Sequence, residues 1–66
     1  MKLIVNDEAL DYQGTPTVLA LLKTLEVQLA HTALMINDEI VPSSMWETAP
    51  LKENDRIEMV VFVGGG

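Results

Sequence analysis

The residues best suited to chemistry are the last three of the sequence, a run of glycines that follows an apolar, strand-like segment. Residues 56–63 read Arg-Ile-Glu-Met-Val-Val-Phe-Val and pass directly into Gly64, Gly65 and Gly66. Glycine has no Cβ, so these residues present only backbone and accept almost any φ and ψ. Three extended residues reach about 10 Å, which suits a channel too narrow for side chains. The pattern predicts a flexible glycine tail, residues 64–66, that carries the carboxylate of Gly66 into a partner's site.

A carboxylate at the end of such a tail is ionised at neutral pH and is a poor electrophile. It must be activated, for example as an acyl-adenylate, before a nucleophile can replace one of its oxygens. The sequence offers no nucleophile–base pair or metal cluster that could carry out this activation. We therefore expect a protein substrate or carrier, without catalytic residues of its own, that an activating partner handles. The alternative is a disordered chain end without a role, because chain ends commonly fray.

Length, charge and cysteine content exclude several classes of function. A core built from 66 residues rarely supplies more than about 3–5 kcal/mol, which leaves little room for a deep active site. Ten acidic residues against four basic ones give a net charge of −6, which argues against binding to nucleic acid or to an anionic membrane. The absence of cysteine excludes disulfides and thiolate metal sites. No segment resembles a signal peptide or a membrane span, so we expect a cytoplasmic protein. We also expect that the chain itself binds no metal or cofactor.

The elements that hold the tail are predicted from turn signals and hydrophobic spacing. Thr17 is expected to cap a helix over residues 18–25, in which leucines recur at helical spacing. Trp46, the largest apolar side chain, is expected at an edge of the core. The other predicted elements are a hairpin (2–6 and 9–12), strands at 33–37, 40–41 and 56–63, and a helical turn at 43–46 capped by Ser43 or Ser44. One helix can cover one face of one sheet, which predicts an α+β fold with a mixed sheet of about five strands in a single domain, residues 1–63.

The last predicted strand carries apolar residues on both faces near its end. Val60 and Phe62 alternate with Met59 and Val61, so the outer side of the strand is not polar there. Either both faces are covered within the domain, or Val60 and Phe62 form an exposed patch that docks a partner. We also expect the last strand to lie beside the first, which would place the tail next to the start of the chain, at Leu3 and Val5.

A single histidine, His31, gives no indication of a catalytic or metal site. The sequence holds no second histidine and no carboxylate cluster at metal-ligand spacing beside it. Histidine titrates in a range that permits acid–base chemistry, but one isolated residue is better explained as part of a loop or the surface.

The whole chain resembles the ThiS-type sulfur carrier proteins of thiamin biosynthesis, which are ubiquitin-like β-grasp domains. The segments that carry the resemblance are K-L-I-V-N-D, T-V-L-A-L-L, L-M-I-N-D-E-I-V-P with M-W soon after, and L-K-E-N-D-R-I-E-M-V-V-F-V-G-G-G. The most specific parts are Asn37 to Pro42, Trp46 and the ending Val-Gly-Gly-Gly. Two departures are small: Asn54-Asp55 stands where the family often has Gly-Asp, and a third glycine, Gly64, is not universal.

The resemblance implies a mechanism and partners. A ThiF-type enzyme would use ATP to adenylate the Gly66 carboxylate, and sulfur from a cysteine-desulfurase route would then leave a thiocarboxylate on Gly66. A ThiG-type thiazole synthase would accept this sulfur, and Gly64 and Gly65 would give access to both enzyme sites. Val60 and Phe62 would be candidates for the docking contacts. Three alternatives remain: a carrier for molybdopterin synthase, a protein modifier that is joined to lysines, and a β-grasp interaction module with an irrelevant tail. Molybdopterin carriers tend to be longer, with prolines before the final glycines.

Overall fold

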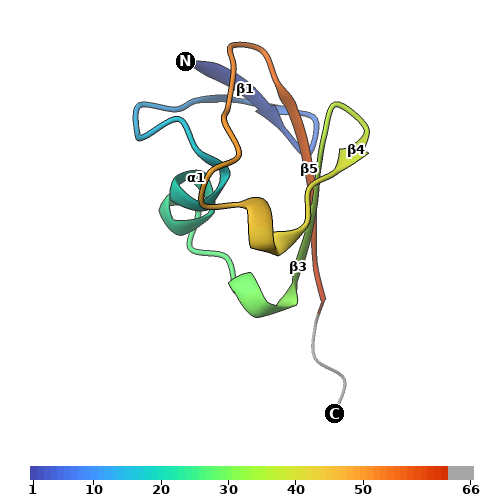
Figure 1. Cartoon of the computed structure of the whole chain (residues 1–66). Helices are drawn as coiled ribbons and strands as arrows, with labels where there is room; N and C mark the ends of the chain where they lie inside the picture. The colour runs from blue at the N-terminus through green and yellow to red at the C-terminus, as the bar shows by residue number, and fades with distance from the viewer. Residues whose placement is uncertain (63–66) are drawn as a thin grey trace.

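A computed structural model describes residues 1–62 and shows one five-stranded sheet with a single α-helix on one face (Figure 1). The strands lie in the order β2-β1-β5-β3-β4, with β5 parallel to β1 and antiparallel to β3. The predicted α+β fold with a mixed sheet is therefore confirmed. The elements are β1 Lys2–Val5, β2 Glu8–Asp11, α1 Val18–Thr24, β3 Thr32–Ile36, β4 Glu39–Ile40 and β5 Arg56–Val61, with short 3₁₀ helices η1 Leu29–His31 and η2 Ser43–Met45.

The two hairpins use the same turn sequence, Asn-Asp-Glu. Asn6 and Asp7 have φ values of 48° and 67°, and Asn37 and Asp38 have φ values of 50° and 70°. A two-residue hairpin turn whose twist matches that of its strands requires positive φ at both positions, which asparagine and aspartate tolerate better than other side chains. Each turn sequence therefore sets the register of its own hairpin, β1–β2 and β3–β4.

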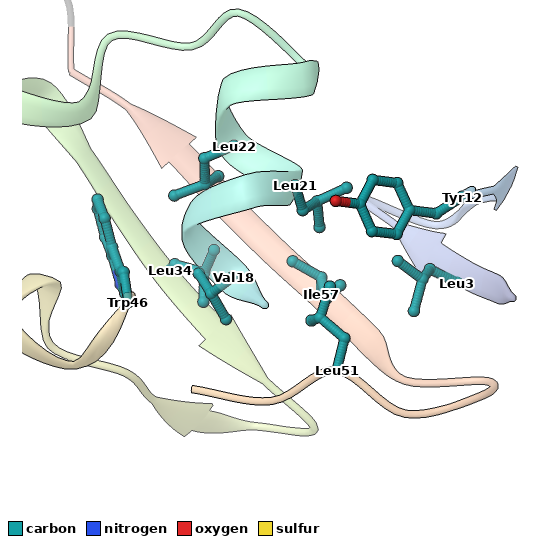
Figure 2. Packing of buried hydrophobic residues seen from close by; sticks show 9 residues of the cluster. All are labelled: Leu3, Tyr12, Val18, Leu21, Leu22, Leu34, Trp46, Leu51 and Ile57. Atoms are coloured by element: carbon teal, nitrogen blue, oxygen red, sulfur yellow. The ribbon is translucent and has the colours of Figure 1, made fainter. Parts of the chain in front are cut away.

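The helix α1 supplies the other half of the core. The Thr17 hydroxyl accepts a hydrogen bond from the Ala20 N–H at 3.4 Å, which confirms the predicted cap. Val18, Leu21 and Leu22 are the buried residues of the helix. They meet buried side chains from the sheet and from the connection before β5 (Figure 2). The complete buried cluster is Leu3, Tyr12, Val18, Leu21, Leu22, Leu34, Trp46, Leu51 and Ile57.

Trp46 closes the core at the end of η2, as predicted. Its side chain is 3% exposed, and its Nε1–H donates a hydrogen bond to the Val41 carbonyl at 2.9 Å. The predicted serine cap of η2 is wrong: Pro42 occupies the N-cap position, and no side-chain cap bond forms. Proline has no side-chain oxygen, and the two serines already lie within the helical turn.

Trp46→Phe is expected to lower the free energy of unfolding by about 1–3 kcal/mol. The substitution leaves the partly buried Val41 carbonyl without its donor, and loss of a partner for such an acceptor costs up to about this much. Urea unfolding followed by circular dichroism measures the loss, because the change removes the only tryptophan and its fluorescence. Met45→Leu is the control, since Met45 is 52% exposed and surface changes stay within about 0.5 kcal/mol. Equal stability of both variants would contradict the role given to the Trp46 hydrogen bond.

The end of β5 lies far from the position expected for it. The pairing of β1 with β5 ends at Val5↔Ile57, whereas β5 continues along β3 as far as Thr32↔Val61. The expectation that the last strand lies beside the first is therefore confirmed, whereas the expectation that its end lies next to Leu3 and Val5 is wrong. Because the two strands are parallel, their starts share one end of the sheet, and β5 leaves at the opposite end from the N-terminus (Figure 1).

Candidate functional site

The predicted tail glycines Gly64, Gly65 and Gly66 lie outside the described residues 1–62, as does Val63. The boundary predicted between the domain and its tail therefore stays a prediction. The candidate site is built from the end of β5, which leads directly to these glycines, and from the surface around it.

Successive side chains of β5 point to opposite faces of the sheet. Ile57 is 1% exposed within the core, and Met59 packs against that core. Val60 and Phe62 are each 58% exposed. Of the two interpretations left open by the sequence, burial of Val60 and Phe62 is wrong and an exposed pair is confirmed. The physical reason is that the only α-helix among residues 1–62 covers the other face of the sheet.

The exposed pair belongs to a larger apolar surface on the outer face of the sheet. A shallow groove of about 210 Å³ lies beside Val60. Ile40, the most exposed large apolar residue of the described chain at 78%, lies at the groove and pairs with Met35 across the β3–β4 hairpin. The groove is lined by Ala33, Leu34, Met35, Ile40, Glu58 and Val60. We call the groove together with Phe62 the outer patch.

Sequence analysis missed Met35 and Ile40 as members of the outer patch. Strand alternation could have identified Met35. Leu34 faces the core, so its neighbour Met35 points to the opposite face of the sheet. The Asn37-Asp38 turn then sets Ile40 opposite Met35. Exposed apolar surfaces are typical of sites where proteins contact one another.

One acidic residue interrupts the outer patch. Glu58 lines the groove, and its carboxylate lies 3.6 Å from the Arg56 guanidinium. Both side chains are substantially exposed, at 41% and 51%, so the pair contributes no more than about 1 kcal/mol to stability. The pair therefore constrains the Glu58 carboxylate only weakly.

His31 lies in η1 and is exposed, as predicted. Its backbone carbonyl accepts a hydrogen bond from the Phe62 N–H at 2.6 Å, so η1 holds the last described residue of the chain against the sheet. Within residues 1–62, no three histidine, aspartate or glutamate side chains gather closely enough to hold a metal ion. No helix in the same part of the chain is long and apolar enough to cross a membrane.

Comparison with known proteins gives consistent matches over the entire chain. The ThiS family model matches residues 3–66. The chain is 33% identical to the sulfur carrier protein ThiS of Escherichia coli over 66 residues, which is 100% of both proteins. It is also 39% identical to the thiazole synthase of Paramagnetospirillum magneticum, but it spans only 20% of the length of that enzyme.

Solved structures match as well. The crystal structure of the thiamine biosynthesis protein ThiS from Geobacter metallireducens superimposes with a TM-score of 0.85 at 29% identity, covering 100% of both chains. The solution structure of a thiamine biosynthesis protein from the same organism gives a TM-score of 0.80 at 29% identity, with 100% of this chain and 88% of the other covered. The predicted β-grasp fold is thereby confirmed.

Proposed function

The chain belongs to the ThiS family of thiamin biosynthesis, and we propose that it carries sulfur as a thiocarboxylate on Gly66. The observation that carries this proposal is the family match, which extends through the glycine ending to residue 66. The E. coli sulfur carrier that matches over its whole length supports the same role. In this proposal the chain is a substrate on which enzymes act, and it has no catalytic residue of its own.

The chemistry takes place in two steps on the carboxylate of Gly66. An adenylating enzyme of ThiF type joins AMP from ATP to one carboxylate oxygen and releases pyrophosphate. Hydrosulfide from a donor then attacks the carbonyl carbon, forms a C–S bond and expels AMP with its oxygen. The resulting thiocarboxylate is a better nucleophile than the carboxylate. Gly64 and Gly65 let this end enter both enzyme sites, because neither residue has a side chain to exclude.

A thiazole synthase of ThiG type accepts the sulfur. The thiazole synthase of P. magneticum includes a segment similar to this entire chain, which supports a direct functional link between the two proteins. The outer patch is the docking surface for both enzymes in this proposal, since its β5 residues come shortly before the tail in the sequence. Val60 and Phe62 are its most exposed members beside the exit of the chain.

The direct test is the intact mass of the chain after incubation with ATP, a sulfur donor and a ThiF-type enzyme. We expect a mass gain equal to the replacement of one oxygen by sulfur, localised to Gly66 by fragmentation. An unchanged mass beside an enzyme that loads its own carrier would overturn the proposed chemistry. Omission of ATP is the control, because the carboxylate is not activated without it.

Phe62→Asp is expected to weaken binding to the adenylating enzyme at least tenfold while leaving the fold intact. Phe62 is 58% exposed, so its replacement changes the free energy of unfolding by about 0.5 kcal/mol or less. Aromatic residues at the centre of an interface commonly contribute more than about 1 kcal/mol to binding. Calorimetric titration measures the affinity, and urea unfolding measures the stability.

Thr24→Asp is the matched control for Phe62→Asp. It adds the same charge at an exposed position of α1, on the opposite face of the sheet. We expect this variant to bind the enzyme as the unchanged chain does. Equal loss of affinity in both variants would show that added negative charge, and not the outer patch, is responsible.

A further inference from the structure

The backbone of β5 has two different edges. The Phe62 N–H bonds to the His31 carbonyl at 2.6 Å, and the Arg56 carbonyl accepts from the Asn37 N–H at 2.8 Å. Even-numbered residues of β5 therefore direct their backbone groups toward β3. In an antiparallel pair the residues between them direct theirs to the other side. The Ile57 carbonyl does so, since it accepts from the Asn6 N–H at 2.8 Å.

Asn6 ends the backbone pairing on the edge of β5 that faces β1. Its side-chain Oδ1 accepts from the Met59 N–H at 2.9 Å, and its Nδ2–H donates to the Met59 carbonyl at 3.2 Å. The amide of Asn6 thus occupies the position that the next residue of β1 would take. The chain itself turns away at Asn6, where φ is 48°, and continues into β2. No strand of residues 1–62 accompanies this edge of β5 beyond Met59.

Val61 is the next residue on the open edge. It pairs with Thr32 at a position between two hydrogen-bonded pairs, so its N–H and C=O both point away from β3. Within residues 1–62, neither group has a hydrogen-bond partner. An open strand edge with free backbone groups is a template for another extended chain.

We propose that an extended segment of the thiazole synthase pairs with this open edge at Val61 and so continues the sheet where Asn6 stops it. This inference rests on the proposed function. Strand addition of this kind is recognised through backbone hydrogen bonds. The open edge and the outer patch adjoin along β5, so an enzyme seated on the patch brings a segment alongside Val61.

We assign the thiazole synthase as the partner because one relative joins the two proteins in a single chain. In P. magneticum a thiazole synthase contains a segment that matches this entire chain at 39% identity. The two units are then neighbours within one polypeptide, where even a short open edge can pair at high effective concentration.

Amide hydrogen exchange measured by NMR tests the pairing, in the free chain and in its complex with the thiazole synthase. We expect the Val61 amide to exchange rapidly in the free chain and at least about 100-fold more slowly in the complex. The neighbouring Phe62 amide is an internal reference, because its bond to His31 protects it in both states. A complex in which Val61 still exchanges rapidly would overturn the pairing and leave the carrier proposal intact. Protection by the ThiF-type enzyme but not by the thiazole synthase would overturn the chosen occupant.

A backbone ester at Val61 separates pairing from simple exclusion of water. The ester, introduced by chemical synthesis, removes the N–H donor and keeps the side chain. We expect about tenfold weaker binding to the thiazole synthase. An ester at Ala9 is the matched control, since its N–H also points outward, on the far edge of β2. In both esters the preceding carbonyl faces a neighbouring strand. Each substitution therefore weakens one hydrogen bond within the sheet to a similar extent.

Unchanged binding by the Val61 ester, or an equal loss in the Ala9 ester, would overturn the pairing. Absence of any complex with the thiazole synthase would overturn the pairing and the partner together. The mass gain on Gly66 is measured without that enzyme, so it still decides separately whether the chain is a sulfur carrier.

Discussion

Addition of a single alanine after Gly66 is expected to abolish sulfur loading and leave the fold unchanged. The added residue moves the reactive carboxylate by one residue, about 3.3–3.6 Å along an extended chain, and puts a methyl group where the proposed channel admits only glycine. The position of a reacting atom matters steeply, because a misplacement of about 1 Å can cost about 100-fold in rate. Intact mass after incubation with ATP, a sulfur donor and the ThiF-type enzyme measures the loading.

Two controls accompany the extended chain. Its circular dichroism and urea midpoint are expected to match those of the unchanged chain, because residues 1–62 make the described core and sheet without the addition. Carboxypeptidase removal of the added alanine restores the native end and is expected to restore loading. An extended chain that loads at the normal rate would show that Gly66 is not the reacting residue. It would favour an interaction module in which the glycines have no role.

Local signals in the sequence predicted the individual elements well. The Asn-Asp turns fix both hairpins because their side chains tolerate positive φ. Thr17 begins α1 because its hydroxyl satisfies an N–H of the first helical turn. The serine cap of η2 failed because a competing residue, Pro42, precedes the serines and takes the N-cap position.

Long-range features were harder to predict, because no spacing in the sequence encodes them. The direction of β5 relative to β1 depends on how the chain crosses over between them, and this decided where β5 leaves the sheet. The bonds from Asn6 to Met59 join residues 53 positions apart. Alternation showed that Val60 and Phe62 share one side of β5. It could not show which side the helix would cover, so their exposure became known only from the fold.

The two faces of β5 have different roles. Residues on one face stabilise the core, whereas residues on the other face are those that we propose to bind a partner. Ile57 and Met59 support the core, whereas Val60 and Phe62 contribute little to it. A chain of 66 residues has few large apolar side chains with which to build its core. The exposure of several large apolar ones on a single face is therefore best explained by a partner that covers them.

Leu21→Ala is expected to unfold a substantial fraction of the molecules at 25 °C. Leu21 is 0% exposed at the centre of the contact between α1 and the sheet (Figure 2). Truncation of a buried leucine to alanine costs about 2–5 kcal/mol, whereas a core of this size supplies only about 3–5 kcal/mol in total. The expected loss is therefore about as large as the whole free energy of unfolding. Urea unfolding followed by circular dichroism gives the loss directly.

Lys23→Ala on the same helix is the control, because Lys23 is exposed and alanine is a good helix former. This variant is expected to keep its stability within about 0.5 kcal/mol. A loss below about 1 kcal/mol for Leu21→Ala would contradict the central place of α1 in the core. The comparison with Phe62→Asp then distinguishes the two faces of the sheet. Leu21→Ala should lower the number of folded molecules and leave the affinity of each one unchanged, whereas Phe62→Asp should do the reverse.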